Sequence, residues 1–189
     1  MPRTNVIDDE FIAEWHPRYD ESEHDERMYQ SLVKKVQEEV SELRTISRPT
    51  FKQIYEWKAA RAKRHVQWKK FQMYDAALRR VLRKSDDRKA ETLVGLPGVR
   101  MPVASTILHF IYPKRFPIVD YRTVETLQHF DCLNKSRSRY FFRDTIAGYR
   151  VFQRVMLNIA RQRQKWSLRQ IDRALFAYHK EELKPKRRA

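Results

Sequence analysis

Glycine is almost absent from this chain, and its scarcity limits the folds open to it. The 189 residues hold three glycines, Gly95, Gly98 and Gly148, and segments of alternating polar and apolar residues are few. Strand-rich folds need such alternation and turn at glycines, whereas helices need neither. The sequence therefore predicts an all-α fold.

Apolar residues recur at helical spacing in several segments. Ser167 lies three residues before Gln170, a capping-box pattern that predicts the start of the last helix. Helices are predicted over 29–43, from Phe51 to about Arg64, and over 71–82. A short helix ending at Val94 follows, and further helices are predicted from Pro102 to about Phe110, from Tyr140 to about Arg163, and from Ser167 onward. We expect an irregular acidic arm over 1–25 that could dock through Phe11, Ile12 and Trp15, a domain over 26–183 that is single or two-lobed, and a basic tail over 184–189.

The charge is concentrated in two blocks. The formal net charge is +16, with +9 in residues 51–90, +11 in 131–189, −5 in 1–50 and +1 in 91–130. Such blocks favour a positive face for a polyanion, with solvated helices as the alternative. In the predicted helix from Tyr140, four arginines lie within roughly 40° of one another, a ridge able to follow a phosphate backbone. They are Arg143, Arg150, Arg154 and Arg161.

Composition also excludes several classes of protein. Cys132 is the only cysteine, which excludes an internal disulfide, a four-cysteine zinc site and a four-cysteine iron–sulfur cluster. No histidine spacing suggests a metal site, and no glycine-rich loop suggests nucleotide hydrolysis. No apolar run reaches the roughly 18 residues of a membrane helix, and the first residues lack a signal peptide's apolar block. We expect a cytoplasmic protein without a membrane partner.

The segment from Leu93 to Ala104 predicts two helices joined by a tight turn. Gly98 can take a backbone conformation closed to other residues, and the second helix begins with N–H groups that attract anions. Pro102 suits the first turn of that helix. An ordinary helical corner is the alternative interpretation.

The turn and the residues after it resemble the helix-hairpin-helix DNA glycosylase superfamily, which includes endonuclease III. Leu96, Pro97, Gly98, Val99 and Ala104 match its hairpin, and an apolar helix and a proline-containing loop then lead to Asp120. The match covers about 30 residues, the hairpin and aspartate loop lying within 87–125. A bacterial subgroup of similar length shares Trp57-Lys58 and the Asp-x-Arg-Thr-Val-Glu run at 120–125.

Two positions depart from the family pattern. Pro102 stands 18 residues before Asp120, where lyase-type members carry a Schiff-base lysine, so the resemblance implies at most a monofunctional glycosylase. Arg100 replaces the second glycine of the hairpin. We expect no cofactor, although the resemblance implies a possible monovalent cation at the hairpin.

The resemblance gives Asp120 the catalytic role, stabilising positive charge on the sugar and activating water. Asp120 is equally suited to cap the following helix. Phosphate contacts are expected from the hairpin and from basic side chains, and a flipped base is expected to meet aromatic residues. The phosphate group is Gly98, Arg100, Met101, Val103, Arg122, Arg143, Arg150, Arg154 and Arg161, and the base pocket or wedge is Trp57, Lys58, His109, Tyr112 and Tyr121.

The sequence thus predicts a monomeric protein that binds double-stranded DNA, is nucleoid-associated when bound, and excises a damaged, modified or mispaired base. Two alternatives stay open. One is a noncatalytic helix-hairpin-helix DNA-binding module. The other is a structured RNA binder or a subunit of a nucleoprotein complex, with the acidic arm as a docking segment or as a cover over the basic face.

Overall fold

Every regular element that the structure describes is helical, which confirms the all-α prediction. The computed structural model describes residues 6–19 and 23–183, so the predicted basic tail lies outside the described residues. The chain divides into two compact units. Unit 1 combines Met1–Asp20 with Pro117–Ala189, and unit 2 is Glu21–Phe116. No described helix is both long enough and apolar enough to cross a membrane.

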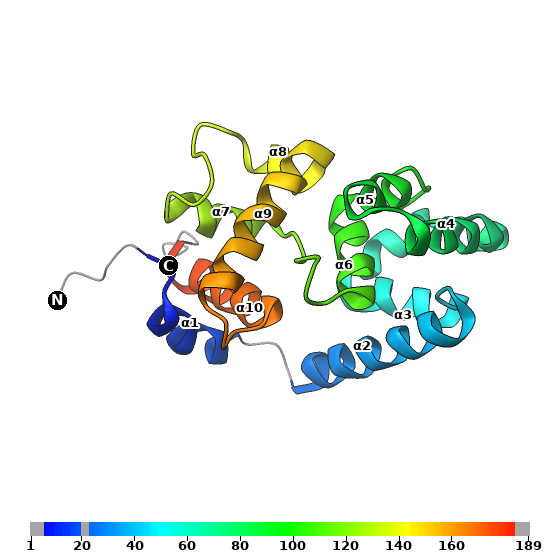
Figure 1. Ribbon diagram of the computed structural model, residues 1–189, viewed down its shortest axis with the longest axis horizontal. Helices are drawn as coiled ribbons and strands as arrows, with labels where there is room; N and C mark the ends of the chain where they lie inside the picture. Colours follow the sequence, from blue (N-terminus) through cyan, green and yellow to red (C-terminus); the bar gives the residue numbers. More distant parts are fainter. Residues whose placement is uncertain (1–5, 20–22, 184–189) are drawn as a thin grey trace, which may run out of the picture. The chain divides into compact units, whose positions relative to one another are not determined.

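Unit 2 is built around α6 (Met101–Ile111), whose side chains are buried at every position except Pro102. Helices α2, α3 and α5 lie against it (Figure 1). Its polar residues are satisfied internally, since the Ser105 and Thr106 hydroxyls both donate to the Pro102 carbonyl. The other elements are α2 (Glu23–Leu43), α3 (Arg48–Ala59), 3₁₀ turns at Ala60–His65 and Trp68–Lys70, α4 (Phe71–Arg83) and α5 (Asp86–Val94).

Unit 1 packs around α10 (Leu168–Tyr178), which contacts α1, α7 and α9 (Figure 1). Ser167 and Gln170 form the predicted capping box at its start. The Thr126 hydroxyl donates to the Leu175 carbonyl and ties α7 to α10. The remaining elements are α1 (Asp9–Trp15), a 3₁₀ turn at His16–Arg18, α7 (Tyr121–His129), α8 (Arg139–Asp144), α9 (Ile146–Gln162) and a π-helical turn at His179–Leu183.

The prediction of an irregular arm over 1–25 is wrong for the part that the structure describes, because Asp9–Trp15 forms the helix α1. Asp8 caps α1 by accepting from the Phe11 N–H at 2.7 Å, and Phe11, Ile12 and Trp15 are buried in unit 1. Trp15 meets Tyr178 of α10 edge to face, with 5.1 Å between ring centroids. The segment therefore contributes to a hydrophobic core, which argues against a detachable cover or docking arm.

The prediction of a single helix from Tyr140 to Arg163 is also wrong, because the helix is interrupted at Thr145. Thr145 caps α9 by accepting from the Gly148 N–H at 3.0 Å. A Cβ at Gly148 would overlap the backbone of Phe141 and Phe142, so glycine allows α8 to pack tightly on α9. Arg143 consequently lies on α8, and the predicted four-arginine ridge on one helix does not exist.

Candidate functional site

The turn between α5 and α6 has the predicted tight geometry. Gly98 has a φ of +76°, and a Cβ there would lie 2.8 Å from the His65 carbonyl. The Val99 N–H closes the turn on the Leu96 carbonyl at 3.0 Å. Both the left-handed backbone and the close approach require glycine at this position.

Two buried tyrosines hold this turn in place. The Tyr55 hydroxyl donates to the Gly98 carbonyl at 3.1 Å, and the Tyr74 hydroxyl donates to the Pro97 carbonyl at 2.8 Å. Tyr74 also accepts from the Gln67 N–H at 2.9 Å. Burial raises the pKa of Tyr55, so its hydroxyl keeps its proton and remains a donor at neutral pH. The sequence indicated neither tyrosine, because they lie on α3 and α4, 43 and 23 residues from the carbonyls that they bind.

The N–H groups of the turn differ in their availability to an anion. Val103 N–H donates to the Arg100 carbonyl and its side chain is buried, which argues against its predicted phosphate contact. The N–H groups of Gly98, Arg100 and Met101 donate no hydrogen bond within the described part of the chain. The Met101 side chain is buried, so only its backbone could reach a phosphate, whereas Arg100 is exposed.

The carbonyls of the same turn, where the family resemblance implies a possible monovalent cation, already accept hydrogen bonds. The carbonyls of Leu96, Pro97 and Gly98 each accept a hydrogen bond inside unit 2, and that of Arg100 accepts two. A carbonyl oxygen has two lone pairs, so a cation could share the oxygens of Leu96, Pro97 and Gly98 with these donors, but not that of Arg100. Within 6–19 and 23–183, no group of three or more histidine, cysteine or acidic residues could hold a metal ion.

A basic segment borders the turn. The His65 carbonyl that approaches Gly98 ends the 3₁₀ turn at Ala60–His65, which carries Arg61, Lys63 and Arg64. Lys69 and Lys70 follow in the next 3₁₀ turn and are exposed, as are Arg61 and Arg64. Unit 2 thus places part of its positive block directly beside the hairpin.

The predicted base-reading residues of unit 2 take different positions. His109 is 1% exposed, and its ring nitrogens lie 2.7 Å from the Tyr29 hydroxyl and 2.7 Å from the Phe116 carbonyl, so it belongs to the core. Trp57 is half-buried against Tyr29 and Phe110, and Lys58 beside it is also half-buried. Tyr112 lies under the cations of Arg115 and Lys89, at 4.7 and 5.0 Å from its ring centroid.

Asp120 belongs to unit 1 and caps α7. Its Oδ1 accepts from the Arg122 N–H at 3.0 Å, and Thr123 completes a capping box with the Asp120 backbone. The Arg122 guanidinium lies 3.7 Å from Oδ1 and stacks over the Tyr121 and Phe176 rings, 4.6 Å from each centroid. The Asp120 side chain is 24% exposed. The carboxylate is therefore fixed in place and reachable by solvent.

The other predicted phosphate ligands of unit 1 lie on two helices. Arg143 binds Asp144 through two hydrogen bonds of 2.7 Å, which raise the pKa of Arg143, and the charge of Asp120 adds to this effect. Arg150, Arg154 and Arg161 are exposed on one side of α9. The α9 arginines keep the predicted common face without Arg143.

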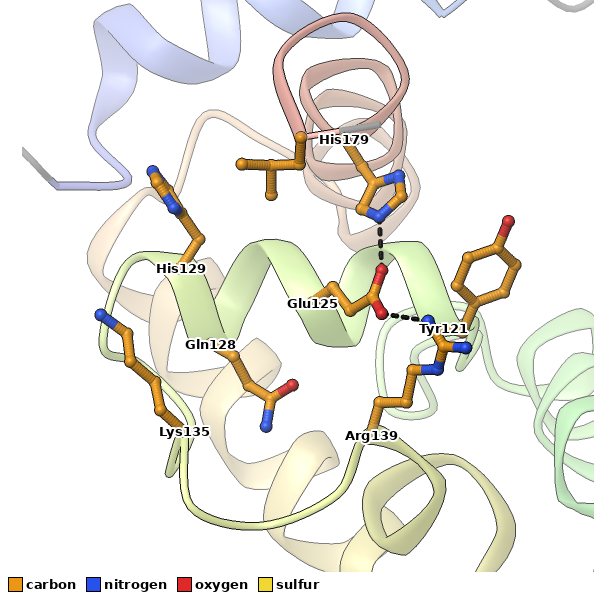
Figure 2. Close-up of a pocket in the computed structure, with 8 residues that line it drawn as sticks. Tyr121, Glu125, Gln128, His129, Lys135, Arg139 and His179 are labelled. Carbon is orange, nitrogen blue, oxygen red and sulfur yellow. Dashed lines mark hydrogen bonds and ion pairs between the residues drawn. The ribbon is translucent and has the colours of Figure 1, made fainter. Parts of the chain in front are cut away.

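A pocket of unit 1 that the sequence did not suggest surrounds Glu125 (Figure 2). One Glu125 oxygen lies 2.5 Å from His179 Nε2, and the other accepts a hydrogen bond from Arg139. The predicted base-pocket residue Tyr121 lines it, with Arg139 5.3 Å from the ring centroid. His179 Nδ1 is buried without a partner in the described structure. The cavity of about 710 Å³ is lined by Tyr121, Glu125, Gln128, His129, Lys135, Arg139, His179 and Leu183.

No family model matches the chain, and comparisons with curated proteins and with solved structures found no match. The fold and the site define an all-helical protein with two features that bear on function. Unit 2 carries a tyrosine-braced glycine turn beside a basic segment, and unit 1 carries a capped, solvent-reachable carboxylate.

Proposed function

We propose that this protein binds double-stranded DNA and removes a damaged, modified or mispaired base as a monofunctional N-glycosylase. The hairpin turn of unit 2 contacts phosphate, and Asp120 of unit 1 acts at the sugar. We also propose that the fold is of the helix-hairpin-helix glycosylase type.

The observation that carries the proposal is the hairpin turn itself. Three N–H groups without a hydrogen-bond partner in the described structure, those of Gly98, Arg100 and Met101, gather at the start of α6. Unpaired amides and the helix dipole together attract an anion. The hydrogen bonds from Tyr55 and Tyr74 fix the turn in the free protein, so little conformational entropy is lost when a phosphate binds.

The net charge of the chain supports a nucleic-acid partner. A formal charge of +16 supplies the sequence-independent attraction that dominates DNA affinity. The exposed Arg100 of the turn, and the arginines of α9, are the side chains we assign to phosphate contacts.

Asp120 supplies the chemistry in this proposal. As the bond between the base and sugar C1′ breaks, positive charge develops on the sugar, and a nearby carboxylate stabilises it. The base leaves with the electron pair of the broken bond and takes up a proton from solvent. Water forms the new bond to C1′, and the proton that it loses passes to the carboxylate. Pro102 has no side-chain amine, so no covalent imine to the sugar forms there.

A noncatalytic DNA-binding module is the second candidate, and one observation favours it. The cap of α7 and the nearby Arg122 already account for the Asp120 carboxylate without any reaction. In that case the hairpin would bind phosphate and the carboxylate would only stabilise α7.

Binding of a transition-state mimic separates the two candidates. A duplex with a cationic azasugar imitates the charged sugar and carries no base, so no lesion has to be chosen. We expect the native protein to bind it at least about tenfold more tightly than an unmodified duplex, because transition-state analogues commonly gain 10²-fold or more. Asp120→Asn keeps the capping oxygen and should lose this preference.

The matched control is Asp131→Asn, which removes the same charge from an exposed position of unit 1. It should keep the preference. Equal binding of both duplexes by the native protein and by Asp120→Asn would refute the catalytic proposal and leave the noncatalytic module.

A further inference from the structure

A second pocket, in unit 2, combines an aromatic ring with cations. It has a volume of about 420 Å³ and is lined by Ala60, Arg61, Lys63, Arg64 and Trp68. This size lies within the range of small-molecule sites. Trp68 has no role in the proposed glycosylase reaction.

The Trp68 ring is held in a fixed orientation. Its Nε1–H donates to the Lys63 carbonyl at 3.0 Å, so the polar edge of the indole is already satisfied. Phe51 and Tyr55 meet the ring at nearly right angles, each 6.3 Å away between centroids. The ring is half-buried, which leaves part of its apolar surface to the pocket. A fixed ring of this kind stacks a planar ligand at low entropic cost.

The charge of the pocket comes from Arg61 and Arg64. Lys63 pairs with Glu56 at 2.9 Å, and this hydrogen bond lowers the pKa of Glu56, so the two charges offset each other. Neither Arg61 nor Arg64 forms an ion pair with a carboxylate of the described residues. Two guanidinium charges are thus left for an anionic ligand, and the pocket lining contains no acidic residue.

We propose that this pocket binds an unpaired nucleotide, with the base stacked on Trp68 and the phosphate held by Arg61 and Arg64. Bases within a duplex are stacked on one another, so an aromatic pocket serves a nucleotide that has left the stack or lies in a single strand. Base stacking on aromatic residues with cations along the backbone is how proteins hold single strands without sequence preference.

The pocket and the hairpin turn share structural supports. Tyr55, which packs against Trp68, also donates to the Gly98 carbonyl. The segment that lines the pocket ends at His65, whose carbonyl approaches Gly98. This inference rests on the proposal of a DNA partner and adds a single-stranded element to the DNA that the protein recognises.

The first experiment is photocrosslinking of the native protein. A 12-nucleotide oligothymidine with one 5-iodouracil is irradiated with the full chain, and the crosslinked peptide is identified by mass spectrometry. We expect the crosslink on Trp68. Crosslinks that leave the segment from Ala60 to Lys70 unmodified would overturn the proposal, whatever the affinities of the variants are.

The second experiment compares the affinities of variants for the same oligothymidine and for a blunt duplex. Trp68→Leu keeps an apolar side chain but removes the aromatic ring. It should weaken single-strand binding at least about fivefold, the lower end for removal of one stacking interaction, with less than twofold effect on the duplex. Arg61→Ala with Arg64→Ala should weaken single-strand binding as well. Trp166→Phe, at a half-buried tryptophan of unit 1 that has no assigned binding role, is the matched control and should bind both as the native protein does.

The two proposals fail separately. Single-strand affinity within twofold of native for Trp68→Leu would refute the nucleotide pocket even if the azasugar preference holds. Loss of the azasugar preference with retained Trp68-dependent binding would refute only the glycosylase. A Trp68→Leu protein with an altered circular dichroism spectrum is replaced by the double arginine variant, whose side chains are exposed.

Discussion

The nearby carbonyl of His65 requires glycine at position 98 as much as the positive φ angle does. The positive φ alone would tolerate asparagine at some cost, but the 2.8 Å approach leaves no room for any side chain. Tyr55 then donates a hydrogen bond to the Gly98 carbonyl, and Tyr74 donates one to the Pro97 carbonyl. A few atoms therefore determine how the hairpin presents its N–H groups.

Replacing Gly98 by alanine should destabilise the protein. We expect a loss of about 2 kcal/mol or more in the free energy of unfolding, from the left-handed backbone and from the collision with His65. Gly95→Ala is the control, because Gly95 has a φ of −70° and the nearest atom to its Cβ lies 4.0 Å away. Urea titration should place Gly95→Ala within about 0.5 kcal/mol of native. Equal losses for both variants would contradict the steric account.

At the level of helices, the break at Thr145 shows how a tertiary contact overrides a local pattern. The apolar periodicity continues without interruption from Phe142 to Ile159, and it predicts one helix. Instead, α8 ends at Asp144 and α9 begins at Ile146, because Thr145 caps α9 and Gly148 leaves room for the backbone of α8. A threonine three residues before a glycine is too common a pattern to have indicated this corner.

The cap at Thr145 contributes measurably to the free energy of unfolding. Thr145→Ala removes the acceptor of the Gly148 N–H and should cost about 1 kcal/mol of stability. Ser85→Ala is the comparison, since Ser85 stands at the N-cap of α5 without a side-chain capping bond. Denaturant unfolding should show the larger loss for Thr145→Ala, and the reverse order would contradict this assignment of the cap.

Most helices could be predicted from the sequence, whereas most site contacts could not. Local signals such as the Ser167 capping box and Pro102 placed helix starts correctly. Partners distant in sequence left no such signal: His179 lies 54 residues from Glu125, and Tyr55 lies 43 from Gly98. Trp68 follows the basic run at 61–65, and that interleaving of aromatic and cationic residues was the one signal that could have singled it out in place of Trp57.

At the scale of the whole molecule, the distribution of charge predicts how the proposed DNA binding responds to salt. Removing one phosphate contact should make the plot of log affinity against log salt concentration shallower by about one unit. Replacing Arg150, Arg154 and Arg161 together by alanine should therefore reduce the slope for a duplex by up to about three. The measurement is duplex affinity from about 50 to 200 mM salt.

A second triple variant controls for net charge. Lys34, Arg88 and Lys135 each lie within 4.0 Å of an acidic residue, and their replacement by alanine also removes three positive charges. It should leave the slope near that of the native protein. Equal slopes for the two triple variants would assign the salt dependence to overall charge and not to the face of α9.

The division of unit 1 between the two ends of the chain sets an order for its folding during synthesis. Unit 2 is continuous and is complete once Phe116 has been made, but α1 finds its partner only when α10, which starts at Leu168, leaves the ribosome. At about 5–20 residues per second, the apolar side of α1 waits roughly 10–30 s. During that interval Phe11, Ile12 and Trp15 are a target for chaperones, and a chain stalled before α10 exposes them permanently.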